Sequence, residues 1–307
     1  MILTVCMSPS TDVTIELDAL NVGKTNVVKS KTLTFGGKAL NVAIGVARLG
    51  GDVHATGIMY TENGAAFENL LKAEGVPYSF AWNPGRVREN YKFIDNRSML
   101  TEVNDVSGEV SEAKAQEVLD KVSELSKQSK VVVFSGGLPK GIDEEYYGKL
   151  VRAADDKTIK IADASGMRML HAVEAGVDLV KPNLEELENI LGKCISDKQD
   201  MLHACYELIA RGAKRVLLSL GKQGAVITDG AKNFYCKSIN VAVNSTVGAG
   251  DGMVAAAAMT LEKGGCLQEV LRAGVAAGTA TVMTTGQTSF TKEKYREVFD
   301  SLQIYQI

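Results

Sequence analysis

The chain has few of the residues that build disulfide frameworks and metal centres. Its 307 residues include five cysteines, an odd number with no Cys-x-x-Cys spacing: Cys6, Cys194, Cys205, Cys236 and Cys266. Its three histidines are equally scattered: His54, His171 and His203. These patterns argue against a disulfide-stapled domain and against a zinc site. We therefore expect buried free thiols in a reducing cytoplasm.

Strong charge and long apolar runs are also lacking. The formal net charge is −3, and no segment carries a basic cluster. This balance argues against a nucleic-acid partner, although a small anionic substrate needs only local positive charge. No apolar run reaches about 18 residues, and the N-terminal segment has no basic region before a long apolar core. We expect a cytoplasmic protein without a membrane partner.

From residue 111 onward, apolar strands alternate with helices. We predict strands at 131–134, 159–163, 178–182, 216–220 and 225–228, and helices at 111–126, 143–155, 184–191, 198–211, 251–263, 267–282 and 291–302. Strands at 2–6 and 53–58 and helices at 38–49 and 64–74 precede them. This order predicts an α/β fold with a mainly parallel sheet covered by helices on both faces. No repeat or linker marks a second domain, so we expect one domain over 1–307.

Three segments in the N-terminal part of the chain have a different pattern of apolar residues. Residues 13–17, 31–35 and 87–103 alternate apolar and polar side chains. Such strands have one wet face and cannot join a core buried on both faces. We therefore predict a separate small β-sheet, a lid formed by about 11–35 and 86–104. Its uncovered face and unpaired edge predict a homodimer through the lids.

Residues 245–258 place glycines directly before an alanine-rich helix. Gly248, Ala249 and Gly250 leave backbone N–H groups unobstructed, and Asp251 follows them. A helix N-terminus with free N–H groups is an anion site. Asp251 is then either a helix cap or a base beside the bound anion.

Glycines, amides and carboxylates recur where predicted strands end. Ser135-Gly136-Gly137, Lys181-Pro182-Asn183 with Glu186, and Ser219-Leu220-Gly221 with Gly224 each follow a strand. Ligands of open α/β sheets gather at the carboxyl ends of strands, so this recurrence favours a site. A Walker A loop is excluded, because Asp18 stands where the first glycine before Gly23-Lys24-Thr25 is required. A G-x-G-x-x-G fingerprint between the first strand and helix is also missing.

Two motifs carry a resemblance to a known family. They are Gly36-Gly37-Lys38-Ala39-Leu40-Asn41 and Thr246-Val247-Gly248-Ala249-Gly250-Asp251. With these motifs the chain resembles, over nearly its full length, the ribokinase-like sugar kinases of the phosphofructokinase B subgroup. The start, MILTVCMSPSTDVTIEL, is similar to the hexose-phosphate kinases of that subgroup. The resemblance implies a ribokinase-like three-layer α/β/α core with a β-sheet lid.

The resemblance also implies an activity. The expected reaction is ATP-dependent phosphorylation of a ketohexose phosphate, first of all a 1-phosphofructokinase reaction that yields fructose 1,6-bisphosphate. Tagatose-6-phosphate kinase activity is the alternative. A non-catalytic sugar or nucleotide sensor on the same fold is a more distant one.

The site residues follow from the same resemblance. Asp251 would accept the proton of a sugar hydroxyl, while backbone N–H groups of 248–251 hold the developing charge. The sugar phosphate would be bound by Asp12, Lys24, Gly36, Gly37, Lys38, Asn41, Arg88 and Asn90. The nucleotide would be bound by Lys181, Asn183, Glu186, Ser219, Gly221, Gly224, Gly274 and Ala277. Glu186 would hold Mg²⁺ through water. Lys24 would act in its own site or in that of the neighbouring subunit.

The chain departs from the family pattern at three positions. Ala39 replaces the last glycine of the usual Gly-Gly-Lys-Gly, which puts a methyl group near the sugar. Ser8 stands where asparagine is common. Ser245 stands where an aspartate often helps to bind a monovalent cation, so K⁺ as a cofactor stays open.

Simpler interpretations compete with these roles. Lys24 could be a solvated lid charge, and Arg88 could pair with Glu89 or Glu102 on the lid. We expect Tyr91 and Phe93 to pack the lid sheet. We expect four methionines to fill the core: Met99, Met167, Met169 and Met283.

Overall fold

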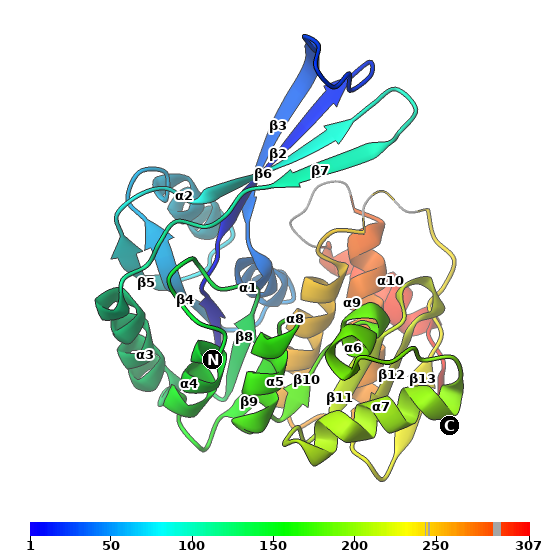
Figure 1. Cartoon of the computed structure of the whole chain (residues 1–307). Coiled ribbons are helices and arrows are strands. Elements are labelled where there is room, and N and C mark those ends of the chain that lie inside the picture. Colours follow the sequence, from blue (N-terminus) through cyan, green and yellow to red (C-terminus); the bar gives the residue numbers. More distant parts are fainter. Residues whose placement is uncertain (243, 245, 285–289) are drawn as a thin grey trace.

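A large sheet with helices on both faces and a small sheet projecting from it make up the structure (Figure 1). This computed structural model describes residues 1–242, 244, 246–284 and 290–307, so Ser245 lies outside the described residues. The strands of the large sheet, in spatial order, are β14 (Ile304–Gln306), β13 (Asn233–Cys236), β12 (Ala225–Thr228), β11 (Val216–Ser219), β10 (Leu179–Val180), β9 (Ile159–Asp163), β8 (Val131–Ser135), β1 (Ile2–Cys6), β4 (Val53–Tyr60) and β5 (Tyr78–Asn83). Neighbours from β11 to β5 pair in parallel, whereas β11 to β14 pair antiparallel.

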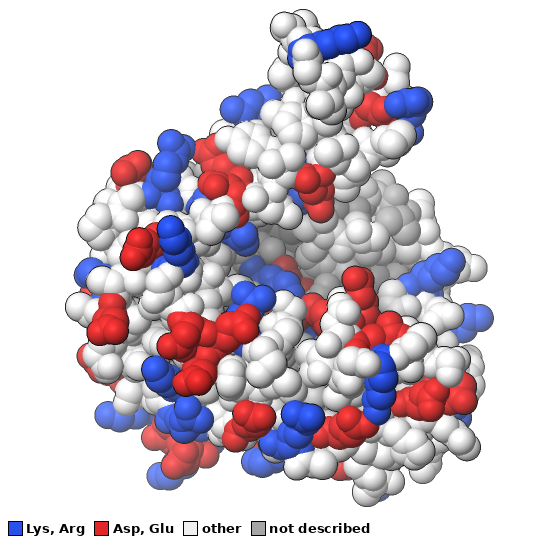
Figure 2. Space-filling model, in the orientation of Figure 1, with Lys and Arg blue, Asp and Glu red and all other residues white. Residues whose placement is uncertain are grey.

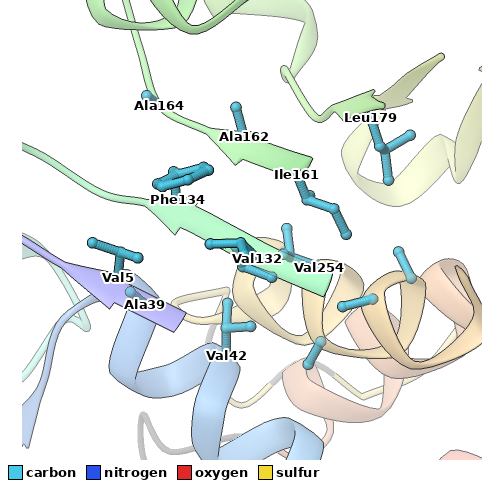
Figure 3. Close-up of a cluster of buried hydrophobic side chains, with 14 of the residues drawn as sticks. Val5, Ala39, Val42, Val132, Phe134, Ile161, Ala162, Ala164, Leu179 and Val254 are labelled. Carbon is cyan, nitrogen blue, oxygen red and sulfur yellow. The ribbon is translucent and has the colours of Figure 1, made fainter. Parts of the chain in front are cut away.

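Helices cover both faces of this sheet, as predicted. One layer consists of α1 (Lys38–Arg48), α8 (Ala249–Glu262), α9 (Leu267–Val282) and α10 (Lys292–Ser301), which pack one against the next. The opposite face carries α3 (Glu112–Ser126), α4 (Tyr146–Ala153), α5 (Met167–Glu174) and α7 (Lys198–Ala210) (Figure 1). Helices α2 (Ala65–Ala73) and α6 (Leu184–Leu191) complete the set. In the core, buried side chains of β1, β8 and β9 meet those of α1 and α8 (Figure 3).

The small sheet contains the alternating segments. Its strands, in spatial order, are β3 (Val28–Gly36), β2 (Ser10–Leu17), β6 (Arg88–Ile94) and β7 (Leu100–Asn104). Tyr91 and Phe93 pack against buried apolar residues of β2 on one face, as predicted. Because side chains alternate along a strand, the other face carries the polar residues Asp12, Asn90 and Lys92. The prediction of a separate small sheet with one polar face is confirmed.

Among the strands and α-helices of the described residues, β5, β13, β14 and α5 were not predicted. β5 and β14 are edge strands, so their side chains are only partly buried and show no clear apolar pattern. Helix α5 begins at Met167, and its N-cap residue, Gly166, provides no side-chain cap. Helix α8 begins at Ala249, two residues before the predicted start, which makes Asp251 its third residue.

Some predicted burials are wrong. Met169 is buried and Met283 packs against the core, but Met99 and Met167 are 59% and 48% exposed. Met99 lies next to β7 at the edge of the small sheet, and Met167 opens α5. Among the free cysteines three are buried, whereas Cys194 and Cys266 are exposed. Within the part of the chain described, no helix combines the length and apolarity needed to cross a bilayer.

Candidate active site

A cavity of about 390 Å³ lies between the small sheet and the carboxyl ends of the parallel strands. Figure 2 shows the hollow beneath the projecting sheet. The cavity brings together most of the predicted site residues: Asp12, Gly36, Gly37, Lys38, Asn41, Arg88, Asn90, Lys181, Asn183, Glu186, Ser219, Gly248, Gly250 and Asp251. Both predicted motifs therefore reach the same space, although they lie at opposite ends of the chain.

Asp251 is buried in the first turn of α8. The N-cap position belongs to Gly248, in the left-handed conformation (φ 81°), and has no side-chain cap. The Asp251 carboxylate instead accepts a hydrogen bond from Asn41 Nδ2 at 2.8 Å. The helix-cap interpretation of Asp251 is therefore wrong.

The pKa of Asp251 is raised to about 6. Burial is the main cause, because it disfavours the charged form, and the carboxylate of Asp163 adds to the effect. Lys38, the Asn41 hydrogen bond and Lys181 act in the opposite direction. A carboxylate with this pKa is a stronger base than a solvated aspartate, yet it remains mostly ionised near neutral pH.

Asp163, at the end of β9, holds the two lysines of the cavity. Its Oδ1 lies 3.2 Å from Lys181 Nζ and 3.6 Å from Lys38 Nζ, and Ser135 Oγ donates to its Oδ2 at 3.2 Å. Burial alone would raise the pKa of Asp163, but Lys181 and then Lys38 hold it below its usual value. In return Asp163 is the main cause of the raised pKa of Lys38, against the effect of burial. Lys38 thus stays charged in the cavity that the N-terminus of α8 also lines.

Sequence reasoning missed Asp163 as a site residue. The available signal was its position as the last residue of the apolar strand predicted at 159–163. This strand ends at the same edge of the sheet as the strands before Gly136, Lys181 and Leu220.

Asn183 and Glu186 form a capping box at the start of α6. Asn183 Oδ1 accepts from the Glu186 N–H at 2.7 Å, and Glu186 Oε2 accepts from the Asn183 N–H at 2.9 Å. The other carboxylate oxygen, Oε1, lies 4.0 Å from Lys38 Nζ. The cap uses one Glu186 oxygen and leaves the other directed toward the cavity.

Glycines let the backbone approach the charged groups closely. Gly37 has φ 130°, and a Cβ there would lie 3.1 Å from Pro9 Cα. A Cβ on Gly250 would lie 3.3 Å from Lys181 Nζ. The Lys181 ammonium therefore lies against the first turn of α8, and together with the helix N-terminus it makes this place favourable for an anion.

On the small sheet, Asp12 is bound by two side chains of β6. Asn90 Nδ2 donates to its Oδ1 at 2.9 Å, and Lys92 Nζ donates to its Oδ2 at 2.7 Å. Lys92 was not predicted as a site residue. The alternation of the strand indicated its face, but not its partner.

Arg88 does not pair with Glu89 or Glu102, so that interpretation is wrong. Glu89 accepts from Arg86 Nη2 at 2.7 Å, while Arg88 Nη1 only reaches the Asp105 carbonyl oxygen at 3.4 Å. Within the described residues Arg88 forms no ion pair, and its buried Nε has no hydrogen-bond partner.

Buried polar atoms without a hydrogen-bond partner concentrate at this cavity. Among the described residues they include Asn41 Oδ1, Arg88 Nε and Asn90 Oδ1. Such atoms are uncommon in proteins because an unmet buried hydrogen bond is costly. Their clustering indicates a site whose hydrogen bonds are completed by a ligand.

Six predicted residues lie outside this cavity: Lys24, Gly221, Gly224, Ala249, Gly274 and Ala277. Lys24 is exposed in the turn between β2 and β3, and Ala249 is the first residue of α8 without lining the cavity. Gly274 and Ala277 are buried in α9, where Gly274 packs against Leu217 and Met253. These two face the core because α9 covers the sheet.

Gly221 and Gly224 line neither cavity, but they flank Lys222 and Gln223, which line a second one. It measures about 750 Å³ and is lined by residues that include Leu184, Leu220 and Tyr235. Leu184 and Leu220 directly follow Asn183 and Ser219, which line the first cavity. The two cavities therefore adjoin at the ends of β10 and β11.

Comparisons with known proteins agree with this geometry. Tagatose-6-phosphate kinase from Staphylococcus epidermidis is 29% identical over 311 residues, which cover 100% of both chains. The 1-phosphofructokinase of Xanthomonas campestris pv. campestris is 32% identical over 265 residues, 84% of this chain and 83% of that protein.

A solved structure shares the whole architecture. Phosphofructokinase-2 from Escherichia coli, in complex with potassium, superposes with a TM-score of 0.91 at 29% identity, covering 97% of this chain and 98% of that chain. Residues 7–294 match the family described as pfkB family carbohydrate kinase, and this span includes the small sheet, every strand of the large sheet except β1 and β14, and every residue of the cavity. The chain therefore belongs to the pfkB family of carbohydrate kinases.

Proposed function

We propose that this protein is an ATP-dependent sugar-phosphate kinase and that fructose 1-phosphate is its acceptor. The observation that carries the proposal is the buried Asp251, with a pKa raised to about 6, at a helix N-terminus beside two lysines. Family membership supports the kinase class. The Xanthomonas relative, named 1-phosphofructokinase, supports fructose 1-phosphate.

A second candidate is tagatose 6-phosphate. It is favoured by the match over the full length to a protein named tagatose-6-phosphate kinase. A non-catalytic sensor is the third candidate, and the environment of Asp251 argues against it. A binding protein has no need of a base with a raised pKa.

In the proposed mechanism Asp251 removes the proton from the sugar hydroxyl that attacks the γ-phosphoryl group of ATP. Asn41 orients the carboxylate through its 2.8 Å hydrogen bond. Backbone N–H groups of 248–251 and the ammonium groups of Lys181 and Lys38 stabilise the charge that develops on the transferred group. Asp163 acts indirectly, because it holds both lysines.

The residues present fit a magnesium ion carried by ATP. Within the described residues no three His, Cys, Asp or Glu side chains form a metal cage. Mg²⁺ does not need one, because it usually binds one or two carboxylates together with phosphates and water. Glu186, through Oε1 and water, would hold it, with Asp163 Oδ1 nearby. When bound, Mg²⁺ neutralises part of the phosphate charge.

We place the nucleotide across the two adjoining cavities. Its phosphates lie at Lys181 and the start of α8, and its base lies beyond Ser219, in the second cavity, whose lining includes the residues between Gly221 and Gly224. Gly274 and Ala277 support the wall from α9 rather than contact the ligand.

We place the sugar phosphate under the small sheet, which acts as a lid on a single domain. Asp12, Gly37, Lys38 and Asn41 bind hydroxyl groups at the floor and rim of the cavity. Arg88 binds the phosphate already present on the acceptor, because its buried Nε is a donor without a partner, while the unpartnered Oδ1 of Asn90 accepts a hydrogen bond from a sugar hydroxyl. Lys24, on an exposed turn, would reach a phosphate only from the lid of a neighbouring subunit.

Asp251→Asn should abolish turnover while nucleotide binding persists. The amide keeps the size of the side chain but cannot accept a proton, and general-base catalysis typically contributes about 10²–10⁴-fold. ADP release is measured with fructose 1-phosphate, and ATP affinity is measured by calorimetry. A folded variant that retains more than about a tenth of wild-type kcat contradicts the role of Asp251 as base.

The pH profile should report the raised pKa of Asp251. Its protonated form cannot act as base, so kcat/KM should be constant above the pKa and fall as pH drops through about 6. Asp163→Asn removes a carboxylate that raises this pKa and leaves the two lysines that lower it. The acid limb of the profile, which is the fall of kcat/KM with decreasing pH, should therefore move to lower pH in this variant.

Ser135→Ala serves as the control for Asp163→Asn, because it removes a hydrogen bond to Asp163 but not its charge. The limb should stay in place in that variant. The titration is followed both by kcat/KM and by carboxyl carbon NMR of Asp251. An unmoved limb in Asp163→Asn contradicts this account of the pKa.

Arg88→Ala should weaken the preference for a phosphorylated acceptor. A guanidinium grips phosphate through parallel N–H···O bonds, each contributing roughly 1.5–3 kcal/mol, so kcat/KM for fructose 1-phosphate should fall by about 10²–10⁴-fold. Activity on fructose should change little. We would measure kcat/KM of the wild type and of Arg88→Ala with fructose 1-phosphate, tagatose 6-phosphate, fructose 6-phosphate and fructose. Arg86→Ala, an exposed arginine paired with Glu89, is the matched control. An unchanged preference in Arg88→Ala places the phosphate elsewhere.

We also propose a homodimer through the lids. The apolar face of the small sheet is only partly covered, and Leu33 and Val103 on that face are 49% and 54% exposed. A second copy would bury this face. Leu33→Asp with Val103→Asp should convert a dimer to a monomer in light scattering, whereas Met167→Asp, at an exposed methionine of α5, should not. A monomeric wild type at working concentrations rules the proposal out.

A further inference from the structure

A buried ion pair lies on the polar face of the small sheet, and only one of its members lines the cavity. Lys92 Nζ lies 2.7 Å from Asp12 Oδ2, and their side chains are 11% and 12% exposed. Asp12 lines the cavity, whereas Lys92 does not. Lys92 therefore contacts Asp12 on the same face of the sheet without lining the cavity itself.

The burial of this pair sets it apart from an exposed ion pair of the same sheet. Lys29 pairs with Asp18, but those side chains are 52% and 77% exposed. Burying two charges removes both from water, so a buried pair is not a stabilising device compared with apolar residues of similar size. The apolar packing on the opposite face does not require this ion pair. The location of Lys92 therefore points to a role in the site.

Lys92 determines what Asp12 does to its neighbours. Asp12 and Arg88 line the cavity on adjacent strands, two register steps apart, which is roughly 7 Å along the sheet. Without a counter-charge, the Asp12 carboxylate would attract the Arg88 guanidinium and repel an anionic substrate. With Lys92 and Asn90 in place, both Asp12 oxygens are occupied from the lid side. Arg88 then keeps a buried Nε with no partner.

We propose that Lys92 is a positioning residue that determines acceptor specificity by neutralising Asp12. With its charge offset by Lys92, the Asp12 carboxylate can accept a hydrogen bond from a sugar hydroxyl. Arg88, on the same face, then binds the phosphate of the same acceptor. The inference rests on the proposed sugar-phosphate kinase function. It assigns the selection of an anionic acceptor to a pair of lid residues in addition to Arg88.

Lys92→Met tests this role, because it keeps the length of the side chain and removes the charge. KM for fructose 1-phosphate should rise about 10–100-fold, with kcat within about threefold of the wild type and KM for ATP unchanged. Lys92→Arg retains a charge and should remain within about threefold of the wild type. Lys29→Met, the matched lysine of the exposed pair, should leave both KM values unchanged. A rise in both KM values, or a loss of kcat alone, overturns the proposal.

A double-mutant cycle separates neutralisation from packing. In the Asp12→Asn background no carboxylate is left to neutralise, so Lys92→Met should change KM for fructose 1-phosphate by less than about threefold. The double variant also has no unpaired buried charge, so its thermal unfolding should show a folded lid even if Lys92→Met alone is unstable. An equal effect of Lys92→Met in both backgrounds overturns the proposal.

The same assays distinguish this inference from the proposed function. A wild type that phosphorylates none of fructose 1-phosphate, tagatose 6-phosphate and fructose 6-phosphate overturns both. An active wild type in which Lys92 and Asp12 are not coupled overturns the inference alone.

Discussion

The buried carboxylate of Asp163 is the constraint on which the cavity depends. It sits at the end of a core strand and attracts Lys181 from the next strand and Lys38 from the start of α1. Each of these charges would be costly to bury alone, and together they are tolerated because every member has an opposite neighbour. The network therefore joins three separate elements at the sheet edge. It also holds two cations in front of the helix N-terminus that carries Asp251.

The two faces of the small sheet differ in chemistry, because one is packed with apolar side chains and the other lines the cavity. One face packs Tyr91 and Phe93 against β2, and the other presents Asp12 and Arg88 to the cavity. A slip of one residue in the pairing of β2 and β6 would exchange these faces, so the register is part of the site. For the hairpin of β2 and β3, the chain enters the sheet after Pro9 and leaves it at Gly37, where a Cβ would lie 3.1 Å from Pro9 Cα. The two connections thus share one narrow crossing above the core.

Local patterns predicted the parts of the protein that local physics determines. Alternating strands and helices predicted the layered core, and polar alternation predicted the small sheet. The glycines before Asp251 predicted a helix N-terminus, because a positive φ and free N–H groups are properties of adjacent residues. Edge strands such as β5 escaped prediction because partial burial gives no clear periodicity.

Partners distant in the sequence could not be predicted in the same way. Asp163 and Lys92 acquire their roles from side chains that only the fold brings near them. A lysine or aspartate in a strand is, by pattern alone, a residue on a wet face. Gly274 and Ala277 are the opposite case, in which a predicted site role meets a core position. The resemblance implied that they contact a ligand, but both are buried in α9.

The charge network also links phosphate binding to the strength of the base. Burial and Asp163 raise the pKa of Asp251, while Lys38 and Lys181 lower it. An anionic phosphate bound to these lysines offsets their positive charge, so their lowering effect on Asp251 weakens while burial increases. In the proposed reaction the carboxylate therefore becomes a stronger base as the nucleotide phosphates arrive. The same two lysines that attract the phosphoryl donor thus prepare Asp251 to accept the proton of the acceptor.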